Sequence, residues 1–289
     1  MKHYTILLMT IAIGLLYGCK ADYGNNDASQ LVVEGWIDKG EFPMIFVTRS
    51  VPVNEEYLEI ADLGQFLERW AKVTISDGER EEVMVGRLDR SYYPPFYYTT
   101  SYMRGEPGKT YQLHVESSGG LTADAETTIT PETAVIDSFW VTPVAHSDTL
   151  YQLHAHINLE ESTAQYFKVF TQNDMNLYTT LSSMLGTFSR DMIGNGDIVI
   201  NRGRKNVDKD YITTFSINDT VDVRLVALSE AQYQYWRSFE DMVSLSRNPL
   251  FPATDNMPSN VTTGMGYWFG YTASAYLVPI RSRIASMRQ

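Results

Sequence analysis

Short stretches in which apolar and polar residues alternate run through the chain and most constrain its fold. In 110–116, Thr-Tyr-Gln-Leu-His-Val-Glu, every second side chain is apolar, as in a β-strand with one face on a core and the other in water. Turn dipeptides such as Asp77-Gly78 separate these stretches,. Strands are expected at 31–37, 44–50, 72–76, 82–88, 97–101, 110–116 and 123–129. Short strands at this spacing predict an immunoglobulin-like β-sandwich over 31–130.

A second set of alternating stretches begins after Pro131, which ends a strand and stiffens a short linker,. We expect these strands at 135–141, 150–159, 166–171, 178–188, 197–200, 211–217, 220–228 and 264–278. The sequence therefore predicts a second, β-rich domain over 134–289. In the last strand, Tyr267, Phe269 and Tyr271 would share one face,.

One helix is expected in this second half. Ser229 and Gln232 have the spacing of a capping box, in which the N-cap hydroxyl and the side chain three residues later satisfy each other's backbone N–H groups,. The apolar residues that follow at helical spacing are Tyr233, Trp236, Phe239, Met242 and Val243,. The predicted fold class is all-β, with an N-terminal immunoglobulin-like β-sandwich followed by a β-rich domain bearing one amphipathic helix.

The N-terminus has the layout of a lipoprotein signal. Lys2 precedes an apolar run over 6–16, which is shorter than the roughly 20 residues that span a bilayer,. Leu16-Tyr17-Gly18-Cys19 closes it, and Cys19 is the single cysteine of the chain. A thioether to a lipid would keep this thiol from unwanted pairing. We therefore expect residues 1–19 to be a signal peptide with a lipidated Cys19; an ordinary cleaved signal or a buried first strand are the alternatives.

Residues 20–30 are small and polar without periodicity, which predicts a flexible tether,. The chain carries 23 Lys and Arg against 35 Asp and Glu, a formal net charge of −12. Nucleic acid is not an expected partner, because phosphate binding needs a basic patch. Electrostatic adsorption to anionic lipid is not expected either, so any membrane attachment would depend on the N-terminal lipid.

The order of several segments resembles a known family. These segments are the lipobox, the 31–37 stretch Leu-Val-Val-Glu-Gly-Trp-Ile, and the stretches 48–53, 71–78, 105–111 and 248–251. In this order they resemble DUF4249, a family of Bacteroidota lipoproteins whose genes often lie beside TonB-dependent receptors. The resemblance implies an outer-membrane lipoprotein that serves as an accessory binding subunit of TonB-dependent nutrient uptake. A structural or adhesive surface lipoprotein is the alternative, and the ligand is unknown.

An aromatic run is the strongest candidate for ligand binding. It comprises Tyr92, Tyr93, Phe96, Tyr97 and Tyr98, with two prolines inside it that favour an extended, edge-like segment,. Outward-facing rings of this kind stack on sugars or peptide side chains. The alternative is that about half of these rings simply belong to the core.

No sequence motif of a known catalytic site stands out. The chain has neither a His-Glu-x-x-His nor a Gly-x-Ser-x-Gly motif,. His154 and His156 would lie on one face of a strand and could supply two metal ligands,. The alternative, that both imidazoles simply face solvent, follows from the inward positions of Leu153 and Ala155. We expect a non-enzymatic protein with no catalytic residues, no cofactor and no metal.

Overall fold

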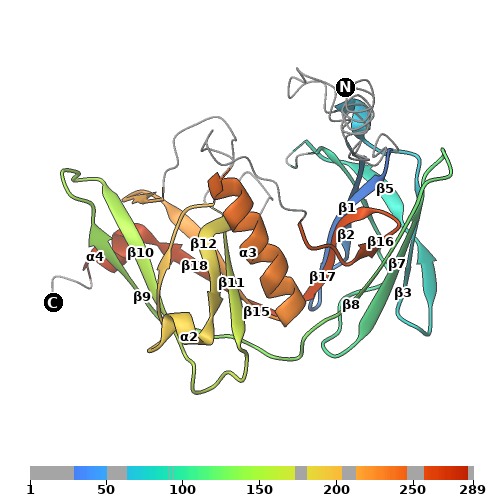
Figure 1. Cartoon of the computed structure of the whole chain (residues 1–289). Coiled ribbons are helices and arrows are strands. Elements are labelled where there is room, and N and C mark those ends of the chain that lie inside the picture. The colour runs from blue at the N-terminus through green and yellow to red at the C-terminus, as the bar shows by residue number, and fades with distance from the viewer. Residues whose placement is uncertain are drawn as a thin grey trace, which may run out of the picture.

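The computed structural model describes residues 29–50, 64–90, 92, 94–172, 181–203, 213–245 and 257–285. It is mostly β, with 51% strand against 13% helix, arranged as two sandwiches side by side (Figure 1). The predicted all-β, sandwich-like fold class is therefore confirmed. In the described part of the chain no helix is both long and apolar enough to cross a membrane. The predicted signal peptide with Cys19 and most of the tether lie outside the described residues.

The first sandwich consists of two five-stranded sheets. Sheet 1 has the order β17 (Met265–Tyr271), β1 (Leu31–Asp38), β2 (Met44–Arg49), β6 (Phe96–Thr99) and β5 (Val85–Leu88). Sheet 2 has the order β16 (Val261–Thr262), β8 (Thr122–Thr128), β7 (Thr110–Glu116), β3 (Lys72–Ser76) and β4 (Glu81–Val83). Alternation turns one face of each sheet inward, as on β7, where Tyr111, Leu113 and Val115 are buried,.

Two strands of this sandwich come from the far end of the chain. β17 runs parallel to β1, with Val33 opposite Gly266, and β16 pairs with β8. Gly266 is required there, because its φ is +110° and a Cβ would collide with the backbone of Val33,. Val261–Tyr271 fall within the range 134–289 assigned from sequence to the second domain. That division therefore has to be amended at the C-terminal side.

The single strand expected at 264–278 is in fact two strands of different sheets. β17 ends at Tyr271, and β18 (Ala273–Pro279) begins after Thr272. The hydroxyl of Thr272 donates to the carbonyl oxygen of Thr130 at 2.6 Å. This bond ties the crossing point to the segment that leaves the first sandwich. Periodicity alone gave no sign of a change of sheet at this residue.

The second sandwich also pairs two sheets. In sheet 3, β10 (Leu150–Ile157) pairs along one edge with β9 (Ile136–Pro143) and along the other with β13 (Asp197–Ile200) and β14 (Phe215–Ser216). Sheet 4 has the order β12 (Leu181–Ser189), β11 (Tyr166–Gln172), β15 (Thr220–Leu228) and β18. Two short helices, α2 (Arg190–Ile193) and α4 (Ile280–Ala285), complete this unit. Its core includes Leu153, Phe167 and Val223, which are all fully buried.

Helix α3 (Glu230–Leu245) lies between the two sandwiches (Figure 1). The predicted capping box is confirmed. The Gln232 N–H donates to the Ser229 hydroxyl at 3.3 Å, and the Ser229 N–H donates to the Gln232 side-chain oxygen at 3.0 Å. The buried stripe differs from the expected one, because it includes Gln232, Tyr235 and Glu240 besides Trp236. These residues face two neighbours at once, sheet 4 and strand β17, so a single apolar stripe does not describe the contact.

Polar contacts join the two sandwiches around α3. The Gln232 side-chain amide donates to the carbonyl oxygen of Gly270 at 3.1 Å, and the Trp236 indole N–H donates to the Tyr271 hydroxyl at 3.0 Å. A third link is the ion pair of Arg224 on β15 with Asp38 on β1, at 3.3 Å. The contact between the two sandwiches therefore covers the end of β1 at which Asp38 lies.

Candidate functional site

The predicted aromatic run is divided between the two faces of sheet 1. Tyr98 points inward and is 3% exposed. Its hydroxyl donates to the carbonyl oxygen of Glu68 at 2.7 Å and accepts from the Ala71 N–H at 2.9 Å. Phe96 lies on the same face, with its ring 5.4 Å from that of Tyr98 in an edge-to-face contact. These two rings belong to the core of the first sandwich.

Tyr92 and Tyr97 lie on the outer face of the same sheet. Their ring centroids are 5.4 Å apart, and each is 5.9 Å from the ring of Phe46 on β2. Both tyrosines are half-buried, so part of each ring remains accessible. Tyr93 lies outside the described residues, as does Cys19. The outer pair is therefore the part of the predicted run that is available for binding.

These rings continue into a row that crosses sheet 1. From Phe46 the row passes to Trp36 on β1, with centroids 5.7 Å apart. Trp36 is in register with Phe269 on β17, and Tyr267 follows that ring at 5.2 Å. Tyr235 of α3 lies 4.9 Å from Tyr267 and 5.3 Å from Phe269. We call this set the aromatic row: Tyr92, Tyr97, Phe46, Trp36, Phe269, Tyr267 and Tyr235.

One carboxylate lies within the aromatic row. Glu34 is in register with Phe46 on one side and Tyr267 on the other, and it shares the outer face of β1 with Trp36,. Its side chain is accessible to solvent, yet the surrounding protein excludes enough water that desolvation raises the pKa of the carboxyl above its usual range,. Burial raises the pKa of Tyr267 and of Tyr235, and the charge of Glu34 adds to both shifts.

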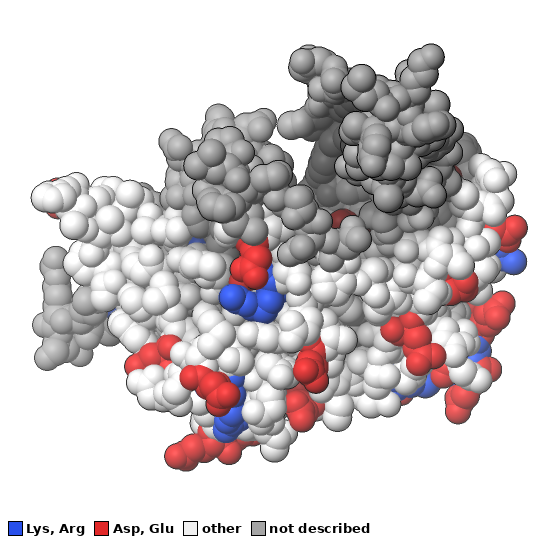
Figure 2. All heavy atoms as spheres, in the orientation of Figure 1, with Lys and Arg blue, Asp and Glu red and all other residues white. Residues whose placement is uncertain are grey.

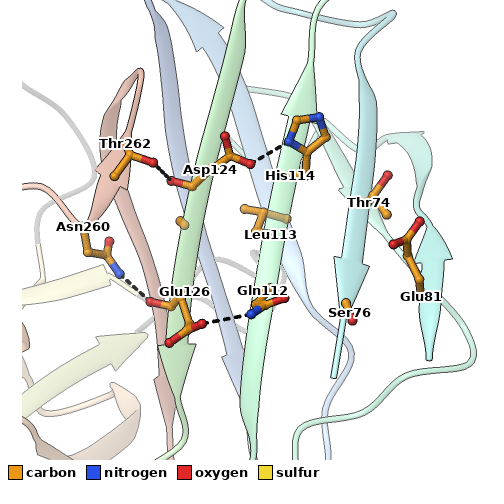
Figure 3. A pocket seen from close by; sticks show the side chains of 11 residues that line it. Thr74, Ser76, Glu81, Gln112, Leu113, His114, Asp124, Glu126, Asn260 and Thr262 are labelled. Atoms are coloured by element: carbon orange, nitrogen blue, oxygen red, sulfur yellow. Dashed lines mark hydrogen bonds and ion pairs between the residues drawn. The ribbon is translucent and has the colours of Figure 1, made fainter. Parts of the chain in front are cut away.

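A second candidate surface is an open recess of about 470 Å³ on the outer face of sheet 2 (Figure 3). Its side chains are polar, and they mostly satisfy one another across the strands. His114 Nδ1 lies 2.6 Å from Asp124 Oδ1, and the Gln112 amide donates to Glu126 at 3.1 Å. The predicted wet face of β7 is thus confirmed for His114. The residues that line the recess include no Phe, Tyr or Trp.

The two histidines of β10 have separate partners. His154 Nε2 is 2.9 Å from the Thr142 hydroxyl, and its ring stacks on Trp140 with centroids 5.4 Å apart. His156 Nδ1 is 2.8 Å from Asp197 Oδ1. Within the described ranges, no three His, Cys, Asp or Glu side chains gather as metal ligands would. Both ring systems are occupied by local contacts.

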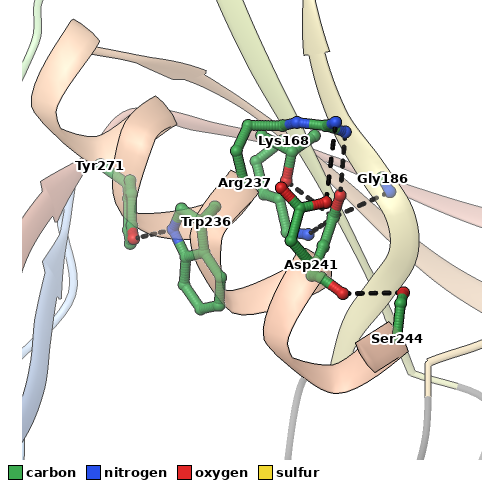
Figure 4. Close-up of polar contacts among 9 residues, drawn as sticks. Lys168, Gly186, Trp236, Arg237, Asp241, Ser244 and Tyr271 are labelled. Atoms are coloured by element: carbon green, nitrogen blue, oxygen red, sulfur yellow. Dashed lines mark hydrogen bonds and ion pairs between the residues drawn. The ribbon is translucent and has the colours of Figure 1, made fainter. Parts of the chain in front are cut away.

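A buried ion pair lies under α3 (Figure 4). Lys168 on β11 contacts Glu240 on α3, and that same carboxylate oxygen accepts from the Gly186 N–H at 3.1 Å and the Thr187 hydroxyl at 2.7 Å. It lies among groups that hold the helix on sheet 4, so its role is structural. On the face shown in Figure 2, acidic side chains lie at several separate places, some with basic ones beside them, and the described residues of this face form no basic patch.

Sequence reasoning identified one end of the aromatic row and missed the rest. Phe46 on β2 and Trp36 on β1 lie at outward positions, where polar residues would be expected on a solvent face,. Glu34, at another outward position of β1, is polar as expected. Apolar residues on both faces of these two strands were the available signal. They indicate that the outer face of sheet 1 is covered or used in binding.

Comparison with known proteins identifies a family. No curated protein matches the chain. The family model described as "Domain of unknown function (DUF4249)" matches residues 19–276, which is most of the chain and includes strands of both sandwiches. The protein therefore belongs to the DUF4249 family.

Proposed function

We propose that this protein is a lipid-anchored outer-membrane protein that binds a ligand without chemical change, as an accessory subunit of a TonB-dependent nutrient uptake system. The observation that carries the binding role is the aromatic row, with accessible rings at Tyr92 and Tyr97 and a solvent-accessible carboxylate at Glu34. Rings with an accessible face and a few convergent polar groups are typical of ligand sites. The anchoring depends on the lipobox at Cys19.

The place of the row in the fold supports binding rather than packing alone. The second sandwich covers the end of β1 at Asp38, which is 7% exposed, whereas Glu34 on the same face of the strand is open to solvent. The row therefore begins inside the contact between the two sandwiches and ends on an open surface. Ligand sites often lie at such junctions between structural units.

Two measurements on membranes test this function. Radiolabelled palmitate should be incorporated into the wild-type chain and not into Cys19→Ala. A TonB-dependent receptor should co-purify in stoichiometric amount with the wild type from detergent-solubilised outer membranes. A labelled chain that co-purifies with no receptor and whose deletion leaves nutrient uptake unchanged would favour the structural or adhesive role. A chain without label would contradict the anchoring.

A further inference from the structure

Glu34 is held at a fixed place among aromatic side chains by strand geometry. Of its neighbours on β1, Val33 points into the core of the first sandwich and Gly35 is buried against that core. Glu34 therefore projects from the outer face, between Phe46 of β2 and Tyr267 of β17. Directly opposite positions on antiparallel strands, such as Glu34 and Phe46, have Cβ atoms about 4.5–5.5 Å apart,. The carboxylate thus emerges with a ring on each side.

In the part of the chain that the structure describes, no cation neutralises this carboxylate. Among the described residues, Glu34 accepts no hydrogen bond and forms no ion pair. Asp38, four residues further along the same face, has Arg224 at 3.3 Å. Glu34 and Asp38 lie on the same face of β1, and among the described residues only Asp38 has a cationic partner. Because a poorly hydrated anion is costly without a counter-charge, Glu34 is prepared for a cation that the described residues do not supply.

The surrounding rings favour the same kind of ligand. The face of an aromatic ring carries partial negative charge and attracts ammonium and guanidinium groups, more strongly where water is excluded. Trp36, Phe46 and Tyr267 lie beside Glu34 on the outer face of sheet 1. Phe46 is 5% exposed and backs the site, whereas Trp36, Tyr267 and Tyr97 are half-buried and keep part of their surface accessible. An anionic ligand would be repelled by Glu34. A neutral ligand could stack on the rings but would leave the carboxylate without a counter-charge.

We propose that Glu34 and the rings of Trp36, Phe46 and Tyr267 form a binding site for an organic cation, an alkylated ammonium or a guanidinium group. The cation would lie against the ring faces, with its charge on the carboxylate. This inference rests on the proposed binding function and names the chemical class of its ligand.

Isothermal titration of the purified full chain in detergent tests the site. The probes are tetramethylammonium and methylguanidinium, with tert-butyl alcohol as a neutral analogue of similar shape. We expect saturable binding of at least one cation and none of the alcohol. Glu34→Gln should weaken cation binding about tenfold or more, because it removes the charge that the ligand pairs with. Glu116→Gln, an exposed glutamate on β7, is the matched control and should bind as the wild type does.

The two cations distinguish an ammonium from a guanidinium ligand. Circular dichroism first establishes that the wild type and Glu34→Gln are both folded. Equal cation binding by these two proteins would then overturn the inference. Absence of saturable binding of both cations to the wild type would overturn it as well. Saturable binding of a neutral sugar that is unchanged by Glu34→Gln would overturn the ligand class and leave the proposed binding function standing. Failure of the receptor to co-purify would instead affect the accessory role and not this site.

Discussion

The Nζ atom of Lys168 lies 2.6 Å from Oε1 of Glu240, and both side chains are withdrawn from solvent, at 0% and 1% exposure (Figure 4). Burial lowers the pKa of Lys168 to about 8, and the neighbouring Glu240 opposes that shift. The pair links strand β11 to helix α3, which also packs on β17 of the first sandwich. A charge pair thus fixes the element that joins the two sandwiches.

Removing one partner of this pair should be far more damaging than removing both. Glu240→Ala leaves the Lys168 ammonium buried without its carboxylate, and we expect it to lower the free energy of unfolding by about 3–5 kcal/mol. Lys168→Met combined with Glu240→Leu leaves no unpaired buried charge and should cost less than that, although the Gly186 N–H and the Thr187 hydroxyl still lose their acceptor,. Urea denaturation measures all three proteins.

The control for this comparison is Asp241, which is 65% exposed on the same helix and 4.0 Å from Arg237. Asp241→Ala should change stability by about 0.5 kcal/mol or less, because exposed ion pairs contribute little. Equal losses from Glu240→Ala and Asp241→Ala would show that the buried pair does not hold the helix.

Asp38 should make the contact between the sandwiches depend on pH. Burial raises the pKa of its carboxyl to about 6, with Arg224 opposing and Glu41 adding to the shift. The folded state therefore binds this proton more tightly than the unfolded state. The resulting stabilisation is fully present below pH of about 4 and is lost as the pH rises through about 6.

Urea denaturation of wild type and Asp38→Asn across this range isolates the effect. The stability of the wild type relative to the variant should increase by about 2–3 kcal/mol between pH 7 and pH 4. A difference that is independent of pH, or one that shrinks on acidification, would contradict the assignment.

The two histidines of β10 should titrate in a defined order. The hydrogen bond with Asp197 raises the pKa of His156, whereas burial lowers that of His154. Two-dimensional NMR of the imidazole nitrogens should therefore find His154 below and His156 above the usual value of 6.5. Asp197→Asn should lower the pKa of His156 more than that of His154, and the reverse order would refute the pairing.

Adjacent tyrosines of β6 should differ in their contributions to stability. Tyr98→Phe leaves the Ala71 N–H and the Glu68 carbonyl without their hydroxyl partner, so we expect a loss of about 1–3 kcal/mol. Tyr97→Phe, its matched control, should change stability by about 0.5 kcal/mol or less, as surface changes usually do. Thermal and urea unfolding compare the two, and similar losses would mean that Tyr97 is also part of the core.

The local pattern of the sequence predicted the strands and the helix start well. Alternation located β7 and β10, and the spacing of Ser229 and Gln232 located the start of α3. Both signals depend on interactions between residues close in sequence. The parallel pairing of β1 with β17 joins the two ends of the chain, and no local rule contains it.

The aromatic row could be predicted only in part, because it too depends on the pairing of strands that are far apart in the sequence. The sequence left open whether the rings of the aromatic run belong to the core or to a binding surface, and the structure assigns Tyr98 to the core and Tyr97 to the outer face. Glu34 has no special feature in the sequence, since a glutamate between Val33 and Gly35 is ordinary for a strand with a wet face. Its significance comes from Phe46 and Tyr267, which tertiary pairing brings to its sides.

NMR of the tryptophan indole N–H groups during titration with tetramethylammonium tests whether an organic cation binds beside Glu34. Trp36 lies in the aromatic row, Trp140 lies in the second sandwich, and Trp70 is 84% exposed and reports non-specific contact. We expect a saturable shift of the Trp36 signal, no saturable shift at Trp140 or Trp70, and loss of the Trp36 response in Glu34→Gln. An unmoved Trp36 signal, or one that responds equally in Glu34→Gln, would contradict it.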